Sequence, residues 1–345
     1  MSFEKIGEEI DRLGLIDLGF KFGPRDVHRK LYEAARRSLD RDRPISLTAA
    51  EKLDGKVKPK DTVLIATGTY FPPWYWYGET DGPPGAAVLA RAVKLHFDAT
   101  PVILTEGPLT DMMAATCRGA GLNVIDFEQA KIARSPSVAI MSFPSDDKDA
   151  QREARRIVSE LNPAAFISIE RMGRNEKGVY HTATGLDISP PVAKIDYVLE
   201  QCNYHHALTI GIGDVGNELG LGKIKDAIRE HMLAGKICNC PCKGGAAVHV
   251  PADIPVIASV SNWATYGIVD CLAAIKDKPE LLHTGEQEIR ALRRCADAGA
   301  VDGRTAFCEY TADGTSEIVD AGVVEMMRTI VIKGLESIKG KTKGF

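Results

Sequence analysis

Residues 211–222, with the sequence GIGDVGNELGLG, decide the fold. They follow an apolar run at 207–210 and precede a helix-like stretch at 223–233. This order predicts a strand, a glycine-rich turn and a helix. Because open α/β sheets bind ligands at the carboxyl ends of their strands, we expect the turn to lie at a functional site.

The turn carries three side chains with oxygen atoms, Asp214, Asn217 and Glu218. Hard divalent cations such as Mg²⁺, Mn²⁺ and Ca²⁺ prefer oxygen ligands, so the sequence predicts a metal site here. The turn also matches the dinucleotide pattern G-x-G-x-x-G at 211–216. A dinucleotide-binding site of this kind needs an acidic residue at the end of a second strand about 20 residues further on, and the sequence has none there.

Strand-like and helix-like runs alternate along the rest of the chain. The predicted strands cover 62–66, 101–105, 123–126, 137–143, 164–169, 207–212 and 255–260. The predicted helices cover 85–97, 109–120, 147–161, 223–233, 263–275, 286–298 and 316–337, after helical stretches at 6–13 and 26–39, where Asp26 is a candidate N-cap. This alternation predicts an α/β fold with a mostly parallel sheet and helices on both faces, a three-layer, Rossmann-like arrangement with an N-terminal helical extension.

Composition narrows the class of protein. Of the 345 residues, 44% are hydrophobic and 26% are charged, which is typical of a soluble globular protein. The net charge of −4 offers no basic surface for nucleic acid, and we expect no membrane segment. Eight cysteines without a secretory signal indicate free thiols in a reducing compartment. We therefore expect a cytoplasmic protein, and a homo-oligomer as is common for such enzymes.

A second acidic segment, GETDGPPG at 78–85, holds Glu79 and Asp81 just before a predicted helix. The two carboxylates could add oxygen ligands to the metal site. They could equally complement the dipole at the N-terminus of the helix. Because this segment also follows a strand of the parallel sheet, we expect it to meet the turn that contains Asp214 at one edge.

Other polar residues stand at predicted strand ends or in turns. Glu170 could bind metal or act as a base, and Arg171 and Arg174 could each bind a carboxylate or phosphate; an internal Glu–Arg ion pair is the alternative. Asn262 could bind substrate or cap the next helix. Asp302 lies in a glycine-bounded turn, which predicts a β-turn or a substrate contact.

Three cysteines with the pattern C-x-C-x-C stand at Cys238, Cys240 and Cys242. Zinc sites usually use C-x₂₋₄-C spacing and need four ligands. The sequence shows no partner set, and His181 has no second histidine at zinc-like spacing. We therefore expect three free thiols, with His181 as a hydrogen-bonding residue of its loop.

The segments GETDGPPGAA, ERMGRN, GLDIS, GIGDVGNELGLGK, SNWATYG and VDGRT occur in this order over 78–305. Their combination resembles the D-glutamate cyclase family. The resemblance implies reversible conversion of D-glutamate to 5-oxo-D-proline and water, with a divalent metal, Mn²⁺ favoured over Mg²⁺. Val215 and Leu221 depart from the glycine and methionine expected at those positions, which leaves the charged residues of the motif in place.

These patterns and the resemblance assign roles to named residues of a metal-dependent hydro-lyase. The expected metal ligands are Asp214, Asn217, Glu218, Glu79 and Asp81. The expected catalytic residues are Glu79, Asp81 and Glu170, and the expected residues binding a small carboxylate substrate are Thr67, Arg171, Arg174, Asn262 and Asp302.

Two other functions fit the same acidic segments. One is a Mn²⁺- or Mg²⁺-dependent phosphatase acting on a small phosphorylated metabolite. The other is a non-catalytic, metal-gated module that binds a small molecule. For each of these functions we expect an N-terminal helical region over 1–50 and an α/β catalytic domain over 51–345, with two sub-lobes divided near 190–205.

Overall fold

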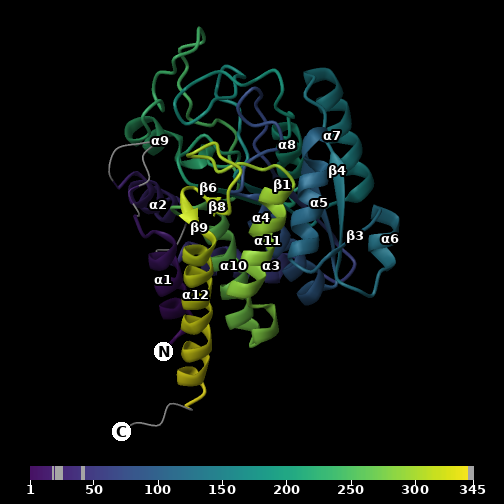
Figure 1. Cartoon of the computed structure of the whole chain (residues 1–345), viewed down its shortest axis with the longest axis vertical. Coiled ribbons are helices and arrows are strands. Elements are labelled where there is room, and N and C mark those ends of the chain that lie inside the picture. The colour runs from purple at the N-terminus through teal and green to yellow at the C-terminus, as the bar shows by residue number, and fades with distance from the viewer. Residues whose placement is uncertain (18, 20–25, 40–42, 341–345) are drawn as a thin grey trace.

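The computed structural model describes residues 1–17, 19, 26–39 and 43–340. At its centre is a seven-stranded parallel sheet with the order β3-β4-β2-β1-β5-β6-β7 (Figure 1). The strands are β1 Thr62–Thr67, β2 Thr100–Thr105, β3 Asn123–Val124, β4 Ser137–Ser142, β5 Ala165–Ile169, β6 Leu208–Gly213 and β7 Ile254–Ile257. The predicted α/β fold with a parallel sheet is confirmed.

Helices cover both faces of the sheet. They are α1 Phe3–Gly14, α2 Val27–Arg37, α3 Ile45–Lys56, α4 Pro83–Ala92, α5 Thr110–Gly119, α6 Phe127–Ile132, α7 Asp147–Leu161, α8 Asp196–Tyr204, α9 Lys225–His231, α10 Ser261–Lys276, α11 Gly285–Asp297 and α12 Glu317–Ile338. Successive side chains of a strand point to opposite faces. In β1, Val63 and Ile65 therefore join the core that contains α3, α4 and α10, whereas Leu64 and Ala66 join the core of α7 and α8.

The N-terminal helices belong to the same body as the sheet. Helices α1 and α3 pack against α10, and α1 lies beside α12, so that elements near the two ends of the chain are neighbours (Figure 1). Helix α11 packs against α4 and α5 on their outer side. The predicted division at residue 50 and the two sub-lobes stay predictions, and residues 341–345 of the predicted domain lie outside the described chain. Within the described residues, no helix combines the length and the apolar character needed to cross a membrane.

The structure corrects several predicted elements. Asp26 precedes α2 but its side chain makes no capping hydrogen bond, because the residue has a φ of 63°. The predicted helix at 223–233 is a 3₁₀ turn, Gly222–Ile224, followed by the shorter α9. The sequence analysis named no helix at α3, α6 or α8, and it missed a two-stranded hairpin, β8 Thr311–Ala312 and β9 Thr315–Ser316.

The order of the strands positions the site. On one side of β1 the chain adds β2, then the edge strand β3 and then β4 between them; on the other side it runs outward from β5 through β6 to β7. The strand order reverses between β1 and β5, which is where open α/β sheets form a crevice for ligands. The segments that follow β1, β5, β6 and β7 therefore meet at one edge of the sheet.

Candidate functional site

Five carboxylates gather at this edge from four segments. One oxygen from each of Asp81, Asp214 and Asp313 lies within 4.8 Å of the other two. The same holds for Glu170, Asp214 and Glu218. Asp214 belongs to both groups, and we call Asp81, Glu170, Asp214, Glu218 and Asp313 the carboxylate centre. The structure thus brings the 78–85 segment and the 211–222 turn together.

Asp81 is fixed by backbone groups. Its carboxylate accepts hydrogen bonds from the N–H groups of Gly82 at 2.9 Å, Ser261 at 2.8 Å and Asn262 at 2.8 Å. The last two N–H groups belong to the first turn of α10, where free donors favour an anion. Asp81 therefore joins the segment before α4 to the start of α10.

Asn262 makes the reciprocal connection. Its Oδ1 atom accepts hydrogen bonds from the N–H groups of Gly82 and Gly85, and its Nδ2 atom donates to the carbonyl of Thr80. Asn262 therefore caps α4, rather than its own helix, and all three hydrogen bonds of its amide are internal. Gly82 has a φ of 99°, and a Cβ there would lie 2.7 Å from Thr67 Oγ1. Thr67 is buried beneath this turn, and its hydroxyl has no hydrogen-bond partner among the described residues.

Glu218 closes the glycine-rich turn. Its carboxylate accepts hydrogen bonds from the N–H groups of Val215 at 3.1 Å and Gly216 at 2.7 Å. A Cβ on Gly213 would lie 2.5 Å from a Glu218 oxygen, so the turn needs glycine at that position. The turn holds Glu218 close to Asp214, with both side chains buried.

Asn217 has a side-chain oxygen that receives no hydrogen bond within the described part of the chain. Its Nδ2 atom donates to the carbonyl of His181 at 2.9 Å, whereas its Oδ1 atom is buried and accepts no hydrogen bond from any described residue. A buried amide oxygen without a donor is costly, and a cation would satisfy it. Together with the carboxylates it fits a hard divalent ion.

Glu79 and Glu170 complete the acidic face. Glu170 has a φ of 44°, a strained conformation for a residue with a side chain and one that often occurs at functional sites. Its carboxylate accepts a hydrogen bond from the Ser261 hydroxyl at 2.6 Å. Glu79 accepts a hydrogen bond from the Thr69 hydroxyl, and a Cβ on Gly303 would lie 2.5 Å from Glu79.

Burial and the neighbouring carboxylates raise the pKa values of these acids. Burial raises the pKa of Glu79, Glu170 and Asp214 well above the usual values, and neighbouring carboxylates add to each shift. Burial also raises the pKa of Asp81, to about 7, against the opposing effect of its backbone hydrogen bonds. The pKa of Asp313 is raised in the same way. So many adjacent carboxylates require either bound protons or a cation to balance their charge.

The carboxylate centre opens into a cavity of about 340 Å³, a suitable size for a small ligand. Phe71, Trp74 and Tyr75 line one part of its wall, and Thr182, Ala183 and Thr184 line another. The acidic lining residues are Glu79, Glu170, Asp214 and Asp313. Among the lining residues, Arg304 carries the positive charge.

The two arginines predicted to bind substrate have internal partners. Arg171 is buried and donates to Glu106 Oε2 at 2.6 Å, and also to the carbonyls of Gly68 and Ala193. Arg174 pairs with Glu200, and its guanidinium lies 4.5 Å above the Tyr197 ring. An internal Glu–Arg pair thus forms at Arg171, but with Glu106 instead of the adjacent Glu170.

Asp302 shapes a loop beside the cavity. Its carboxylate accepts hydrogen bonds from the N–H groups of Arg304 and Thr305, both at 2.9 Å, and of Gly314 at 2.7 Å. It therefore ties the VDGRT segment to the β8–β9 hairpin, in agreement with the turn expected there. These contacts place Arg304 and Asp313 at the cavity.

Sequence reasoning missed Asp313 and Arg304. The dipeptide Asp313–Gly314 between short β-prone runs is a signal for a tight hairpin turn, so the hairpin itself was predictable. Its position next to Asp214 depends on contacts between distant segments, which local patterns do not reveal.

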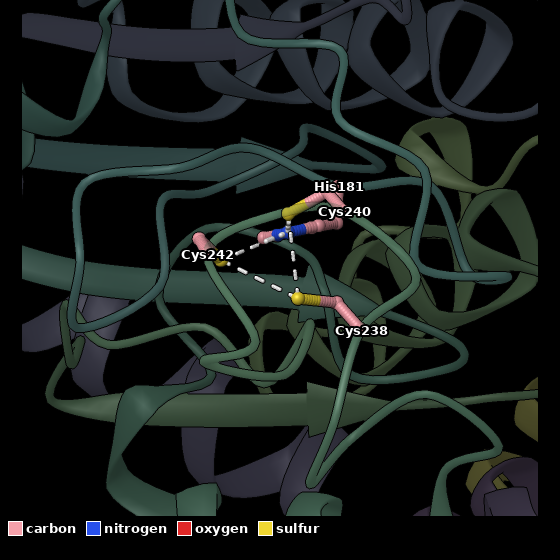
Figure 2. Close-up of side chains that lie close together, drawn as sticks. All are labelled: His181, Cys238, Cys240 and Cys242. Atoms are coloured by element: carbon pink, nitrogen blue, oxygen red, sulfur yellow. Dashed lines mark hydrogen bonds between the residues drawn. The ribbon is translucent and has the colours of Figure 1, made fainter.

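The three cysteines are free thiols, as expected, but the structure gives them a neighbour that the sequence analysis did not pair with them. His181 stands beside them, with its Nε2 atom 3.3 Å from Cys240 Sγ and 3.7 Å from Cys242 Sγ (Figure 2). The fourth residue was missed because it lies 57 residues before Cys238 in the sequence.

Comparison with known proteins supports the resemblance seen in the motifs. A family described as "D-glutamate cyclase-like, C-terminal" matches residues 26–328. The chain is also similar to "D-glutamate cyclase, mitochondrial" of Homo sapiens, with 30% identity over 222 residues. This alignment covers 61% of the present chain and 32% of the human protein, so the match spans about a third of that relative. Since the family match covers most of the chain, the protein belongs to the D-glutamate cyclase-like, C-terminal family.

Proposed function

We propose that this chain is a divalent-metal-dependent hydro-lyase that interconverts D-glutamate and 5-oxo-D-proline plus water. The observation that carries the proposal is the buried carboxylate centre around Asp214, which faces a small cavity containing one guanidinium group. Membership of the family supports the choice of substrate.

Asp214 is the residue best placed to hold the cation, because it belongs to both carboxylate groups. Glu170, Glu218, Asp81, Asp313 and the free oxygen of Asn217 supply the other candidate ligands. When bound, the cation, Mn²⁺ in preference to Mg²⁺, supplies Lewis-acid polarisation of the γ-carboxylate. No thiol or imidazole belongs to this donor set, which suits a hard ion.

Arg304 is the candidate partner of the substrate α-carboxylate. A guanidinium group can bind a carboxylate with two parallel hydrogen bonds, which fixes both distance and orientation. Phe71 and Tyr75 give the cavity an apolar wall for the methylene groups of the substrate. Holding the substrate in a folded conformation in this way brings its amino group towards its γ-carboxyl carbon. This lowers the entropic cost of ring closure.

Glu79 is the candidate general acid and base. It lines the cavity, and burial raises its pKa well above the usual value, so its carboxyl group holds a proton more readily than an ordinary glutamate does. Ring closure forms a C–N bond and breaks a C–O bond. Two of the three ammonium protons leave with one γ-carboxylate oxygen as water, and the third stays on the lactam nitrogen. Glu79 would carry these two protons in succession.

The direct test is product formation by the purified protein with and without Mn²⁺. We expect D-glutamate to yield 5-oxo-D-proline, and the reverse reaction to occur from 5-oxo-D-proline, only when Mn²⁺ is present. Turnover of p-nitrophenyl phosphate in place of D-glutamate would favour the phosphatase. Thermal stabilisation by D-glutamate without any product would favour the binding module.

A further inference from the structure

Four side chains outside the carboxylate centre form a compact cluster, which we call the thiol cluster: His181, Cys238, Cys240 and Cys242. Cys238 Sγ lies 3.4 Å from Cys240 Sγ and 3.3 Å from Cys242 Sγ. All four ligand atoms lie within 4.8 Å of one another, and Figure 2 shows the side chains pointing towards a common centre. We propose that this cluster binds one structural Zn²⁺ ion, which fastens the cysteine segment to the wall of the substrate cavity.

The donor set is the first argument for zinc. Three cysteine sulfurs and one imidazole nitrogen form a Cys₃His set, one of the usual combinations in structural zinc sites. A Zn–S bond of about 2.3 Å implies a distance of about 3.8 Å between sulfurs in a tetrahedron. The observed sulfur–sulfur distances of 3.3 and 3.4 Å are somewhat shorter than that edge, and the sulfur–nitrogen distances are 3.3 and 3.7 Å. Four protein ligands leave no open position, so the ion would be structural.

The backbone explains how such closely spaced cysteines share one ion. Bends at 239 and 240 and a turn at 241–242 shorten the distances between the three sulfurs. The N–H of Gly244, at 3.3 Å, and the Nδ2 atom of Asn175, at 3.5 Å, donate to Cys242 Sγ. Donors of this kind around a sulfur are typical of metal-bound thiolates.

The surrounding chain shows why a metal would be useful there. Residues 232–253 form no helix and no strand beyond bridges at Pro251, although Cys238 and Cys240 are buried. Long irregular segments need specific contacts to stay ordered. His181 precedes Thr182, Ala183 and Thr184 of the cavity wall. A zinc ion would therefore connect the irregular segment directly to residues that shape the cavity.

The thiol cluster is connected to the turn that carries Asp214 and Glu218, without sharing ligands with the carboxylate centre. The carbonyl of His181 accepts a hydrogen bond from Asn217 of that turn, which also lines the cavity. Soft thiolates select zinc, whereas hard carboxylates select Mn²⁺ or Mg²⁺. The two sites are therefore chemically distinct, and loss of one metal does not require loss of the other.

The test is the metal content of the full chain, purified without a metal-affinity step from zinc-supplemented cells. We expect about one zinc per chain in the wild type and in Cys308→Ser, which changes an exposed cysteine outside the cluster, and little zinc in Cys240→Ser. His181→Cys should keep the zinc, because Cys₄ is also a zinc set, whereas His181→Ala should bind it more weakly. Asp214→Asn should keep the zinc whether or not it turns over D-glutamate.

Cobalt substitution of the wild-type protein provides a readout that does not depend on any variant. Co²⁺ at the thiol cluster should give thiolate-to-cobalt charge-transfer bands and the absorption of a tetrahedral ion, both removed by added Zn²⁺. Wild-type protein without zinc and without these bands would overturn the proposal. So would a chain that contains iron and sulfide, or one in which Cys240→Ser retains the full zinc content.

Discussion

The carboxylate centre and the thiol cluster are connected by a hydrogen bond from Asn217, in the turn that carries Asp214 and Glu218, to the carbonyl of His181. The first consists of oxygen donors and opens into a cavity. The second consists of sulfur and nitrogen donors, and all four are directed at one another. Neighbouring loops can therefore carry sites of two different kinds. A set of hard oxygen ligands that opens into a cavity is suited to a catalytic metal, whereas a closed set of soft ligands is suited to a structural metal.

We expect the largest effect from a substitution that disrupts the carboxylate centre alone. Asp214→Asn should lower Mn²⁺-dependent turnover of D-glutamate by roughly 10³-fold, equivalent to about 4 kcal/mol, because the cation loses the carboxylate common to both groups. Steady-state kinetics with saturating Mn²⁺ measure this loss. The same sample should keep its circular dichroism spectrum and its zinc. Near-normal activity of the variant would refute the role of Asp214.

We expect the next largest effect from a substitution that disrupts the thiol cluster alone. Cys240→Ser should lower the free energy of unfolding by about 4 kcal/mol, since removal of a structural metal belongs to the most damaging changes. Denaturant unfolding in the presence of zinc, compared with Cys308→Ser, provides the measurement and its control. Equal stability of the two variants would show that the cluster has no structural ion.

A third substitution tests whether Arg304 binds the substrate in the cavity. Arg304→Gln should raise KM for D-glutamate by about 10- to 100-fold, because a charged hydrogen bond contributes about 1.5–3 kcal/mol. Turnover at saturating substrate should change less, since we propose that Arg304 binds the α-carboxylate and not the reacting atoms. Arg293→Gln, which removes an arginine that pairs with Glu317 and does not line the cavity, is the matched control. An unchanged KM would remove Arg304 from the substrate site.

The smallest effect concerns pH. Asp81 has a pKa of about 7 in the folded, metal-free protein, against 3.8 as its ordinary value. Its contribution to stability is therefore complete below about pH 4 and is lost as the pH rises through about 7. The other raised carboxylates act in the same direction. Bound Mn²⁺ would hold these groups ionised, so the gain in Tm on adding Mn²⁺ should be greater at pH 8 than at pH 5. A larger gain at pH 5 would contradict this account.

Much of the fold follows from local patterns in the sequence. Apolar runs such as 62–66 and 207–212 predicted strands because buried parallel strands need continuous hydrophobic residues. The same patterns placed Glu170 and Asp214 at strand ends, and parallel strands bring such ends to one edge. The acidic part of the site was therefore predictable from element order.

The remaining contacts depend on long-range packing that periodicity does not encode. Arg171 found its partner in Glu106, after β2, instead of in the adjacent Glu170. Asp302 ties Arg304 to the hairpin that carries Asp313, and Asp313 meets Asp214, which precedes it by 99 residues. His181 joins Cys238 across a separation of 57 residues. Each case needed tertiary structure, since the residue types alone were compatible with ordinary loop roles.

The most direct measurement is a Mn²⁺ titration of D-glutamate turnover, using protein that retains zinc but has been freed of weakly bound cations. The account predicts no 5-oxo-D-proline without Mn²⁺, and a rise to saturation as the carboxylate centre of the wild type fills, absent in Asp214→Asn. Full turnover before Mn²⁺ is added, or none at saturating Mn²⁺, would contradict it.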